Sequence, residues 1–273
     1  MTVGDVLRRA TEHLGKTSDT ARLDAELLLA HTLGRRRIEL YTDFDRPLNT
    51  DELDAYRGLV ARRARREPVA YILGEWGFRR LTLAGDDRAL IPRPETEIVV
   101  ERALARLEGR ERPRVLDVGA GTGAIALSIA DEHAGADVTA IDLSAEALAL
   151  ACENASRTGI AISLVEHDLR DGLPGGPYDL VVSNPPYVEE HELETLMPDV
   201  RDYEPHVALV GAGATEAVAR AALDVLTPGG WLVLEVGDGQ APATAALLDE
   251  LGYADVTTTQ DLTGRERVVE GRR

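Results

Sequence analysis

The chain is poor in the residues that mark secreted, membrane-spanning or metal-binding proteins. Only one of its 273 residues is cysteine, so no internal disulfide can form, and this usage fits a reducing cytosol. Cys152 falls in a helical pattern, which favours a packed thiol over a nucleophile. No apolar run has membrane-spanning length, and residues 1–10 read as an amphipathic helix and not as a secretion signal. The histidines and the cysteine lack metal-ligand spacing. We therefore expect a cytoplasmic protein with no metal site and no membrane partner.

Basic residues are scarce in the larger part of the chain. Residues 1–75 contain 13 Lys and Arg against 13 Asp and Glu, whereas the remaining 198 residues contain 17 against 35. The formal net charge of −18 therefore comes entirely from residues 76–273. An acidic surface repels the phosphate backbone, so we predict that this part binds no nucleic acid directly.

The N-terminal part reads as a small helical bundle. Its apolar periodicity and capping residues predict three helices: one over 2–14, one from Ser18 or Asp19 to residue 33 with Gly34 as its stop, and one from Asn49 or Thr50 that ends before Pro68. The bundle carries two arginine clusters, Arg35 to Arg37 and Arg62, Arg63, Arg65 and Arg66. We interpret each cluster as a solvated helix face in preference to a docking site for an acidic partner.

Glycines, aromatics and short alternations follow Pro68. Residues 71–78 and 80–85 predict the two strands of a β-hairpin. A helix then opens at about Pro94, because proline is favoured in a first helical turn. We place the domain boundary in this bridge. The expected domains are a helical substrate-recognition domain at 1–75, a β-hairpin bridge at 76–90 and a catalytic domain at 91–273.

Strand and helix patterns alternate from residue 112 onward. This order predicts an α/β fold with a doubly wound parallel sheet. The expected strands are 114–118, 138–142, 162–167, 178–183 and 230–237, and a terminal β-pair is expected at 254–259 and 265–270. The expected helices are 124–133, one capped by Ser144 that runs to 158, 214–226 and 241–251.

A glycine-rich loop, Gly119-Ala120-Gly121-Thr122-Gly123, follows the first of these strands. Glycines let the backbone approach a ligand closely, and Asp142 at the end of the next strand can accept from two ribose hydroxyls. Nicotinamide cofactors and S-adenosylmethionine share both needs. The third glycine of the loop and Asp168, placed to meet an adenine amine, favour S-adenosylmethionine. No hydride-transfer constellation is present.

The stretch Asn184-Pro185-Pro186-Tyr187 stands directly after the buried strand 178–183. Neither proline can donate to a ladder and each restricts the residue before it, so the chain is held stiffly where open α/β sheets bind ligands. The Asn184 side-chain oxygen and the Pro185 carbonyl can each accept one N–H of a carboxamide, and Tyr187 can lie against its flat face. We call this pair of acceptors the nitrogen clamp. The alternative is a proline-rich turn that only caps the strand.

Together these motifs resemble the HemK/PrmC family, the peptide-chain release factor glutamine N5-methyltransferases. Asn-Pro-Pro-Tyr alone is shared with adenine-N6 DNA and guanine-N2 RNA methyltransferases, so it specifies only amino-methyl transfer. The segment Ile91-Pro-Arg-Pro-Glu-Thr-Glu97 is far more specific. The similarity covers essentially the whole chain and rests on six segments: 71–74, 91–97, 117–123, 141–142, 184–187 and 202–209.

The resemblance implies a Rossmann-like, seven-stranded class I methyltransferase domain preceded by the helical bundle and the hairpin bridge. It implies S-adenosyl-L-methionine as cofactor and the glutamine of the Gly-Gly-Gln motif of peptide chain release factors as substrate, with the enzyme expected to be a monomer. The implied cofactor contacts are Gly119, Ala120, Gly121, Thr122, Gly123, Asp142, Leu169 and Asn184, to which our own reading adds Asp168. The implied glutamine contacts are Asn184, Pro185, Pro186 and Tyr187, of which Asn184, Pro185 and Tyr187 are the expected catalytic residues.

Two positions depart from the family's pattern. Leu169 stands where many members have an aromatic residue beside the adenine, which would loosen cofactor packing. Residues 210–214 replace a commoner glycine-rich acidic segment, which puts the local loop in doubt but not the chemistry.

Three other functions remain open at this point. The nearest is methylation of the equivalent glutamine in a ribosomal protein. A nucleic-acid base methyltransferase is disfavoured, because the chain has no additional recognition domain and its catalytic part is acidic. A non-enzymatic binding module with a cofactor fold is disfavoured further, because the glycine loop and the nitrogen clamp are both intact.

Overall fold

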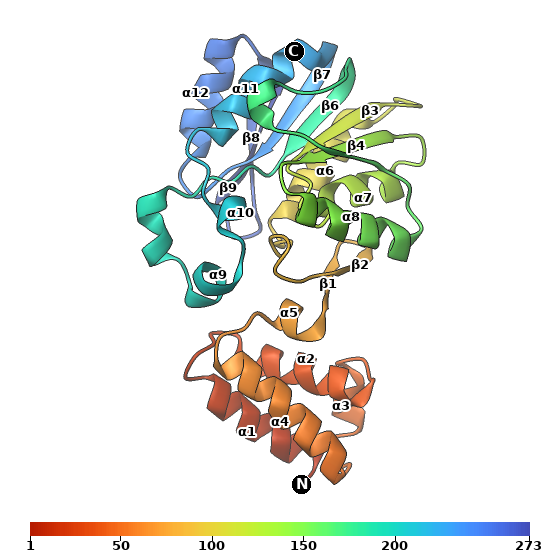
Figure 1. The fold of residues 1–273 in the computed structure, drawn as a ribbon, viewed down its shortest axis with the longest axis vertical. Coiled ribbons are helices and arrows are strands. Elements are labelled where there is room, and N and C mark those ends of the chain that lie inside the picture. Colours follow the sequence, from red (N-terminus) through yellow and green to blue (C-terminus); the bar gives the residue numbers. More distant parts are fainter. The chain divides into compact units, whose positions relative to one another are not determined.

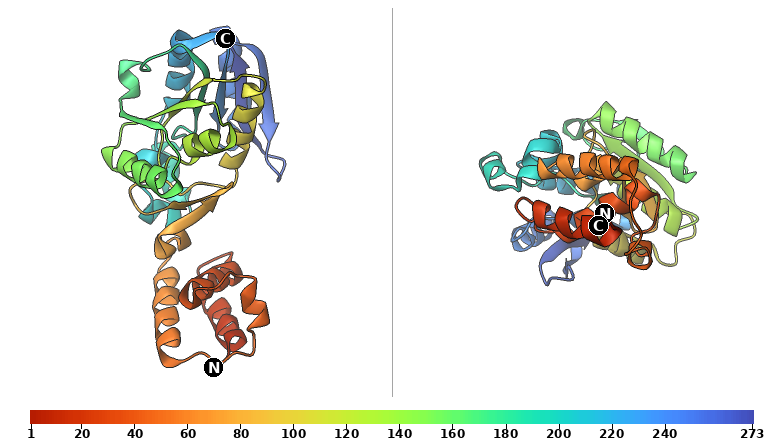
Figure 2. Two further views of the ribbon diagram at one scale, coloured as in Figure 1. Left: turned by 90° about the vertical axis from the view of Figure 1, so that its right-hand side faces the viewer. Right: turned by 90° about the horizontal axis from the view of Figure 1, so that it is seen from below.

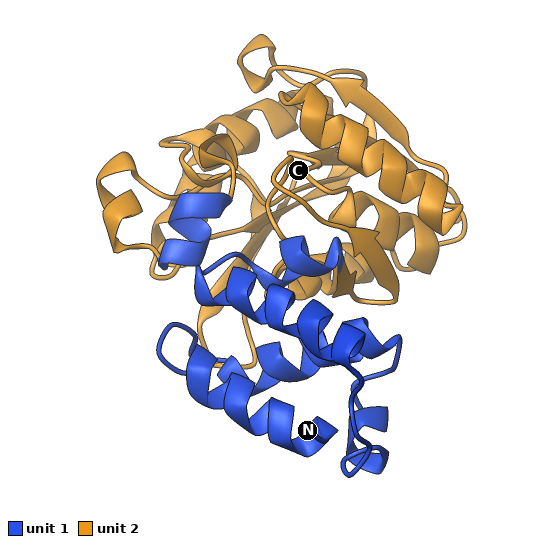
Figure 3. Cartoon of the chain, turned by 60° about the horizontal axis from the view of Figure 1, so that its bottom comes forward, with its two compact units in different colours: residues 1–75, 197–203 blue, residues 76–196, 204–273 orange.

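A computed structural model describes all 273 residues of the chain, which form two units (Figure 3). Unit 1 consists of Met1–Glu75 together with Met197–Tyr203, and unit 2 consists of Trp76–Leu196 together with Glu204–Arg273. The chain therefore leaves unit 2 after residue 196 and returns to it at residue 204. The predicted division into a recognition domain, a bridge and a catalytic domain assigns a function to each part of the chain, and these functions stay predictions.

Unit 1 is a helical bundle, of which residues 1–75 are red and orange in Figure 1 and α9 is teal. Thr2 and Asn49 each form a capping box, so the predicted starts of the first and third helices are confirmed. The second helix starts later than predicted, because the Ser18 hydroxyl donates to Asp24 at 2.7 Å and does not cap the helix. The helices of the unit are α1 (Val3–Leu14), α2 (Ala21–Leu33), α3 (Glu39–Thr42), α4 (Thr50–Ala64), α5 (Val69–Leu73) and α9 (Pro198–Tyr203).

A buried ion-pair network centred on Arg63 lies inside unit 1. Its Nε donates to Asp24 Oδ2 at 2.7 Å, and its Nη2 donates to Ser18 Oγ at 3.3 Å. Its Nη1 donates to Asp199 Oδ2 at 3.3 Å, which attaches the segment 197–203 to the bundle. The side chains of Arg63 and Asp24 are 7% and 5% exposed. The network therefore holds charges that are largely buried, and each depends on its partner.

The arginine cluster at 62–66 differs from the solvated helix face that we expected. Arg63 is buried, and Arg62 forms an ion pair with Glu67. The guanidinium of Arg66 donates to a backbone carbonyl at 3.1 Å. The expectation is therefore wrong for Arg63, because a long-range carboxylate pair draws its side chain inward. Arg35 to Arg37 are exposed, as expected, but they lie in the loop between α2 and α3 and not on a helix face.

The hairpin between the bundle and the large sheet is present. Strands β1 (Glu75–Phe78) and β2 (Leu81–Ala84) form a two-stranded sheet, which confirms the predicted hairpin. The first strand is shorter than predicted, because residues 71–73 belong to α5. This helix ends where Gly74 adopts a left-handed conformation with φ of 73°. Residues 71–73 form a short aromatic and aliphatic run, and the composition of such a run fits a helix as well as a strand.

Unit 2 is built on a seven-stranded sheet in the order β5-β4-β3-β6-β7-β9-β8. Neighbours from β5 to β7 are parallel, whereas β9 runs antiparallel to both β7 and β8. The predicted Rossmann-like fold is confirmed, and so is the terminal β-pair. The strands are β3 (Arg114–Val118), β4 (Asp137–Asp142), β5 (Ser163–Glu166), β6 (Tyr178–Ser183), β7 (Leu226–Glu235), β8 (Ala254–Gln260) and β9 (Glu266–Arg272).

Helices cover both faces of this sheet (Figures 1 and 2). Val115 and Leu180 belong to the core that α6 and α7 share with the sheet, whereas Leu116 and Val181 belong to the core on the side of α11 and α12. Both faces are buried, as expected of near-continuous apolar strands. The helices are α6 (Thr96–Leu107), α7 (Ala124–Glu132), α8 (Ala145–Thr158), α10 (His206–Leu209), α11 (Ala214–Val225) and α12 (Ala241–Leu251), with short 3-10 turns η1 (Leu169–Asp171) and η2 (Glu190–Thr195).

Several local expectations need correction. Cys152 is exposed on α8, so the packed thiol predicted from the helical pattern is wrong. Helix α6 begins at Thr96, two residues after the predicted start at Pro94. The sequence patterns did not reveal η2, α9 and α10, each of which spans six residues or fewer. No helix of the chain is both long and apolar enough to cross a membrane.

The Arg63 network yields a prediction about stability. Arg63→Ala leaves Asp24 as an uncompensated buried charge, and we expect the free energy of unfolding to fall by about 3–5 kcal/mol. Arg57→Ala is the matched control, because Arg57 lies on the same helix in an exposed pair with Asp54, and we expect little change. Urea unfolding followed by circular dichroism measures both. Equal losses in the two variants would contradict the role of the network.

Candidate active site

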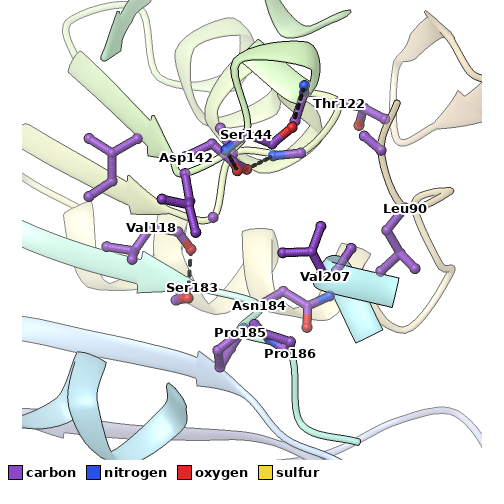
Figure 4. Close-up of a pocket in the computed structure, with 18 of the residues that line it drawn as sticks. Leu90, Val118, Thr122, Asp142, Ser144, Ser183, Asn184, Pro185, Pro186 and Val207 are labelled. Atoms are coloured by element: carbon purple, nitrogen blue, oxygen red, sulfur yellow. Dashed lines mark hydrogen bonds between the residues drawn. The ribbon is translucent and has the colours of Figure 1, made fainter. Parts of the chain in front are cut away.

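A cavity opens in unit 2 at the carboxyl ends of β3, β4 and β6. The chain enters the sheet at β3, builds outward to β5, and then crosses to β6 on the other side of β3. This reversal is a topological switch point, which is where open α/β sheets bind ligands. Asp142 and Ser144 lie on one side of the cavity, and Asn184 to Pro186 lie on the other (Figure 4).

The glycine loop after β3 forms one wall. The amides of Gly119 and Ala120 both donate to the Ile141 carbonyl, at 2.8 and 2.9 Å, so the loop turns sharply over the end of β4. Gly119 and Gly121 have φ values of 83° and 53°, which favour glycine. No heavy atom lies within 4 Å of the position that a Cβ would take at Gly121. The backbone of the loop is therefore open toward the cavity.

Asp142 is the acid that the sequence predicted at the end of β4. Its Oδ2 accepts from the Gly121 amide and its Oδ1 accepts from the Ser144 amide, both at 2.9 Å. These bonds fix the orientation of the carboxylate. Each carboxylate oxygen can accept further bonds, so the pair of oxygens remains able to receive two hydroxyl groups of a ligand.

The nitrogen clamp forms the opposite wall. The Ser183 hydroxyl donates to the Val118 carbonyl at 2.6 Å, which ties the end of β6 to β3. Asn184 Nδ2 donates to Thr96 Oγ1 at 3.3 Å, and its Oδ1 is left for another donor. Behind the prolines, a Cβ at Gly211 would come within 2.4 Å of the Pro186 ring. The departure at residues 210–214 thus keeps a glycine where the chain passes Pro186.

An ion pair joins two of the segments that border the cavity. Arg93 pairs with Glu204, whose side chain is 1% exposed, and the Ile91 amide donates to Glu204 at 3.3 Å. Pro92 and Pro205 next to this pair both line the cavity. The segments 91–97 and 202–209, which are far apart in the sequence, therefore meet at one charge pair.

Comparison with known proteins shows the family. A family model described as the PrmC N-terminal domain matches residues 5–74, and one described as the methyltransferase small domain matches residues 96–199. A release factor glutamine methyltransferase of Geobacter sulfurreducens is 44% identical over 261 residues, covering 94% of this chain and 91% of that protein. One from Deinococcus radiodurans is 42% identical over 280 residues, covering 100% and 99%.

The chain belongs to the release factor glutamine methyltransferase family. Solved structures also support its fold. A Thermus thermophilus 16S rRNA N2 G1207 methyltransferase, solved with AdoMet and guanosine, matches with a TM-score of 0.52 and 20% identity over 73% of this chain and 49% of that one. A Pyrococcus furiosus methyltransferase matches with a TM-score of 0.51 and 19% identity over 70% and 88%. At these identities the likeness shows the fold alone, that of class I methyltransferases.

Most of the predicted site residues of this family member line one cavity. They are Gly119, Ala120, Gly121, Thr122, Asp142, Asp168, Leu169, Asn184, Pro185 and Pro186. Gly123 and Tyr187 do not line it. A Cβ at Gly123 would come within 3.3 Å of Ala151, so this glycine allows α7 to pack close to α8. The Tyr187 carbonyl accepts from Gln240 at 3.1 Å, and its ring lies against Gly237. The roles assigned to these residues stay predictions.

Of the two residues expected beside the adenine, Asp168 already has a hydrogen-bond partner, whereas Leu169 offers an apolar side chain. Asp168 accepts the guanidinium of Arg170 with both oxygens, and this bond lowers the pKa of the Asp168 carboxyl to about 2. Leu169 is half-buried at the edge of the cavity. Leu143, which is 53% exposed, adds a second apolar side chain to the same cavity. Two aliphatic residues thus provide apolar surface where relatives were expected to use an aromatic one.

Three features of the site escaped the reading of the sequence. Thr96 lines the cavity and holds Asn184, although it only marks a helix start in the sequence. The buried Asn154 donates to the Thr122 carbonyl at 3.0 Å and to the Ala84 carbonyl at 3.2 Å, which joins the hairpin to the glycine loop. Burial raises the pKa of the Asp117 carboxyl to about 8. Of these residues, only Asp117 could have been noticed in the sequence, because it interrupts the apolar residues of a buried strand.

The residues present fit S-adenosylmethionine. The open backbone of the glycine loop, the oriented Asp142 carboxylate and the apolar side chains of Leu143 and Leu169 supply what a nucleoside needs: close approach, hydroxyl acceptors and a flat apolar surface. Asn184 lies across the same cavity, so a cofactor held by the loop would present its reactive end to the nitrogen clamp.

This arrangement predicts the effect of removing Asp142. A charged acceptor for hydroxyl groups contributes roughly 1.5–3 kcal/mol, so Asp142→Ala is expected to weaken S-adenosylmethionine binding about tenfold or more. Asp137→Ala is the control, since Asp137 is the exposed first residue of the same strand. Isothermal titration calorimetry measures both affinities, and thermal unfolding checks that the variants fold. Unchanged affinity in Asp142→Ala would refute the assignment.

Proposed function

We propose that this chain transfers a methyl group from S-adenosyl-L-methionine to the side-chain amide nitrogen, N5, of the glutamine in the Gly-Gly-Gln motif of peptide chain release factors, and so supports translation termination. The observation that carries the proposal is the nitrogen clamp at the mouth of a cofactor cavity, in a chain of the release factor glutamine methyltransferase family. We further propose that the enzyme works as a cytoplasmic monomer, since one chain contains both the cavity and the clamp.

The chemistry of the amide explains why a clamp is needed. An amide nitrogen is a poor nucleophile, because its lone pair is delocalised into the carbonyl. When bound, S-adenosylmethionine supplies a methyl group on a sulfonium sulfur, which is already a strong electrophile. Orientation is therefore the main requirement, and positioning of this kind contributes on the order of 7–11 kcal/mol.

Asn184 and Pro185 can supply that orientation. The Asn184 Oδ1 and the Pro185 carbonyl are acceptors for the two N–H groups of the glutamine amide, and both residues line the cavity. Acceptors on the N–H groups favour the positive charge that develops on the nitrogen during transfer. An N-alkylated cationic amide is very acidic, so its proton can leave after the transfer. We therefore assign no general base.

Mass spectrometry tests the activity directly. Release factors and ribosomal proteins are incubated separately with the enzyme and labelled cofactor, and the modified residue is located in each. We expect methylation at the Gly-Gly-Gln glutamine of release factors. Label only on a ribosomal protein, or on neither, would overturn the proposed substrate.

Removing the side-chain acceptor tests the clamp. In Asn184→Ala we expect turnover to fall by about 10²–10³, as is common when one preorganised polar contact to the reacting group is lost. Some loss of cofactor affinity is allowed, because Asn184 borders the cofactor cavity. Single-turnover kinetics at saturating cofactor separate the two effects. A variant with near-normal turnover would show that the amide is held elsewhere.

Recognition of the whole release factor needs contacts away from the amide. A glutamine side chain offers too little surface to be distinguished from other glutamines, so specificity must come from remote contacts. We assign these to unit 1. Its segment between α2 and α4 exposes three large apolar side chains, Ile38, Tyr41 and Phe44, with exposed fractions of 65%, 55% and 45%. They stand next to Arg35 to Arg37 and form the surface that we propose to contact the protein substrate.

A point substitution tests this surface better than a deletion of residues 1–75, which would leave the segment 197–203 of unit 1 in place. Deletion would strip Asp199 of its partner Arg63 and disturb the chain that follows the nitrogen clamp. Ile38→Ser keeps the bundle, and Leu262→Ser removes a fully exposed leucine elsewhere as the matched control. We expect Ile38→Ser to raise KM several-fold for the intact release factor but not for a short Gly-Gly-Gln peptide. A parallel change for both substrates, or for Leu262→Ser as well, would argue against the surface.

A further inference from the structure

A buried carboxylate without an ion-pair partner lies next to the nitrogen clamp. Glu235, the last residue of β7, is 2% exposed, and its Oε2 has no hydrogen-bond partner. The arginines around it pair with other acids, Arg93 with Glu204 and Arg267 with Asp261. Burying a carboxylate without an ion-pair partner costs stability. Folding therefore does not explain why a glutamate is present here.

One hydroxyl connects this carboxylate to the clamp. Ser183 on β6 is opposite Leu234 on β7, so Asn184 and Glu235 follow on adjacent strands. Thr96, which is 4% exposed, is the side chain whose hydrogen bond lowers the pKa of the Glu235 carboxyl, and because an ionised carboxylate can only accept, Thr96 is the donor. Asn184 Nδ2 donates to Thr96 Oγ1 at 3.3 Å. The three side chains form one directed chain of hydrogen bonds, from Asn184 through Thr96 to Glu235.

The direction of this chain follows from counting protons. A threonine hydroxyl has one proton, and an ionised carboxylate can only accept, so the proton of Thr96 is committed to Glu235. The hydroxyl oxygen can then only accept from Asn184, and of the two ends of that amide only Nδ2 can donate. Oδ1 is left for the ligand. If Glu235 could donate, the hydroxyl could instead donate to Oδ1, and the amide could turn its NH2 toward the substrate.

We propose that Glu235 is a positioning residue, which acts through the Thr96 hydroxyl to hold the Asn184 amide with its oxygen toward the substrate nitrogen. The inference rests on the methyl transfer proposed above and adds the residue that sets the polarity of the clamp. Glu235 does not line the cavity, so it acts through Thr96 and does not touch the reacting atoms. A reversed Asn184 amide would face the substrate N–H groups with N–H groups of its own.

Protonation of Glu235 removes this control, so the clamp depends on pH. Burial raises the pKa of the Glu235 carboxyl to about 7, and the hydrogen bond from Thr96 opposes that rise. Because the ionised form is the one that orients the amide, kcat is expected to increase as pH rises through about 7. The charged and titratable groups that face Glu235 are Glu95 and Arg93 ahead of α6, Arg267 on β9, and Tyr187 after β6, whose own pKa is raised by burial and then by Glu235.

Kinetics of four variants test the proposal. Glu235→Gln keeps the shape but can donate, Thr96→Val keeps the shape but lacks the hydroxyl, and Thr96→Ser restores the hydroxyl without the methyl group. Ser128→Ala is the control, because it removes a buried hydroxyl of the same unit that has no partner. For each variant, kcat and KM for a release factor are measured from pH 6 to 9, with cofactor affinity from calorimetry.

We expect Glu235→Gln and Thr96→Val to lose kcat about tenfold or more with little change in KM, less than the full loss of the Asn184 acceptor. The rise of kcat near pH 7 should disappear in Glu235→Gln. Thr96→Ser and Ser128→Ala should stay close to the unmodified enzyme. The proposal is overturned if Glu235→Gln keeps normal kcat and the same pH dependence, or if Thr96→Val is active and Thr96→Ser is not.

A measurement without substrate separates this inference from the proposed function. The side-chain amide signal of Asn184 in a nitrogen–proton NMR spectrum, assigned by its loss in Asn184→Asp, should shift with pH through about 7 in the unmodified protein and not in Glu235→Gln. If the chemical shift of this amide does not change with pH in either protein, the positioning role of Glu235 is overturned. If the unmodified enzyme shows this shift but methylates no release factor, the proposed function is wrong and the positioning role of Glu235 is supported.

Discussion

The termination of β6 at Asn184 is the constraint on which the site depends. Two prolines in succession end the ladder directly at the switch point of the sheet, so the chain cannot continue as a strand and must turn across the cavity. The Pro185 carbonyl and the Asn184 amide are consequently placed by a buried strand and not by a surface loop. The hydroxyl of Ser183, bonded to β3, fixes the last residue before the turn. The fold itself thus positions both acceptors, which is what the proposed amide alkylation requires.

Two of the segments that carry the family resemblance meet at one charge pair. Arg93 and Glu204 come from stretches that share no sequence pattern, and their contact buries the carboxylate almost completely. Because an ion pair at such depth depends on both partners, loss of either Arg93 or Glu204 would leave the other without its partner. The pair holds the segments 91–97 and 202–209 together at the border of the cavity.

The sequence alone predicted what local patterns encode. The alternation of strands and helices, the capping residues Asn49 and Ser144, and the strand 178–183 followed from periodicity and cap chemistry, which involve residues only a few positions apart. The contacts it missed join distant positions. Arg63 meets Asp199 across 136 residues, and Asn184 meets Thr96 across 88. No local pattern carries such a pairing, so the sequence could identify the clamp but not what orients it.

The chain passes between its two units three times, after residues 75, 196 and 203. A domain joined by a single linker can be exchanged between relatives by one crossover. Here, a crossover between the units would bring together an Arg63 from one parent and an Asp199 from the other, and the buried pair would survive only where both parents have it. The two segments of unit 1, residues 1–75 and 197–203, therefore depend on each other although residues 76–196 separate them. Chimeras of related enzymes should be designed with residues 197–203 taken from the same parent as residues 1–75.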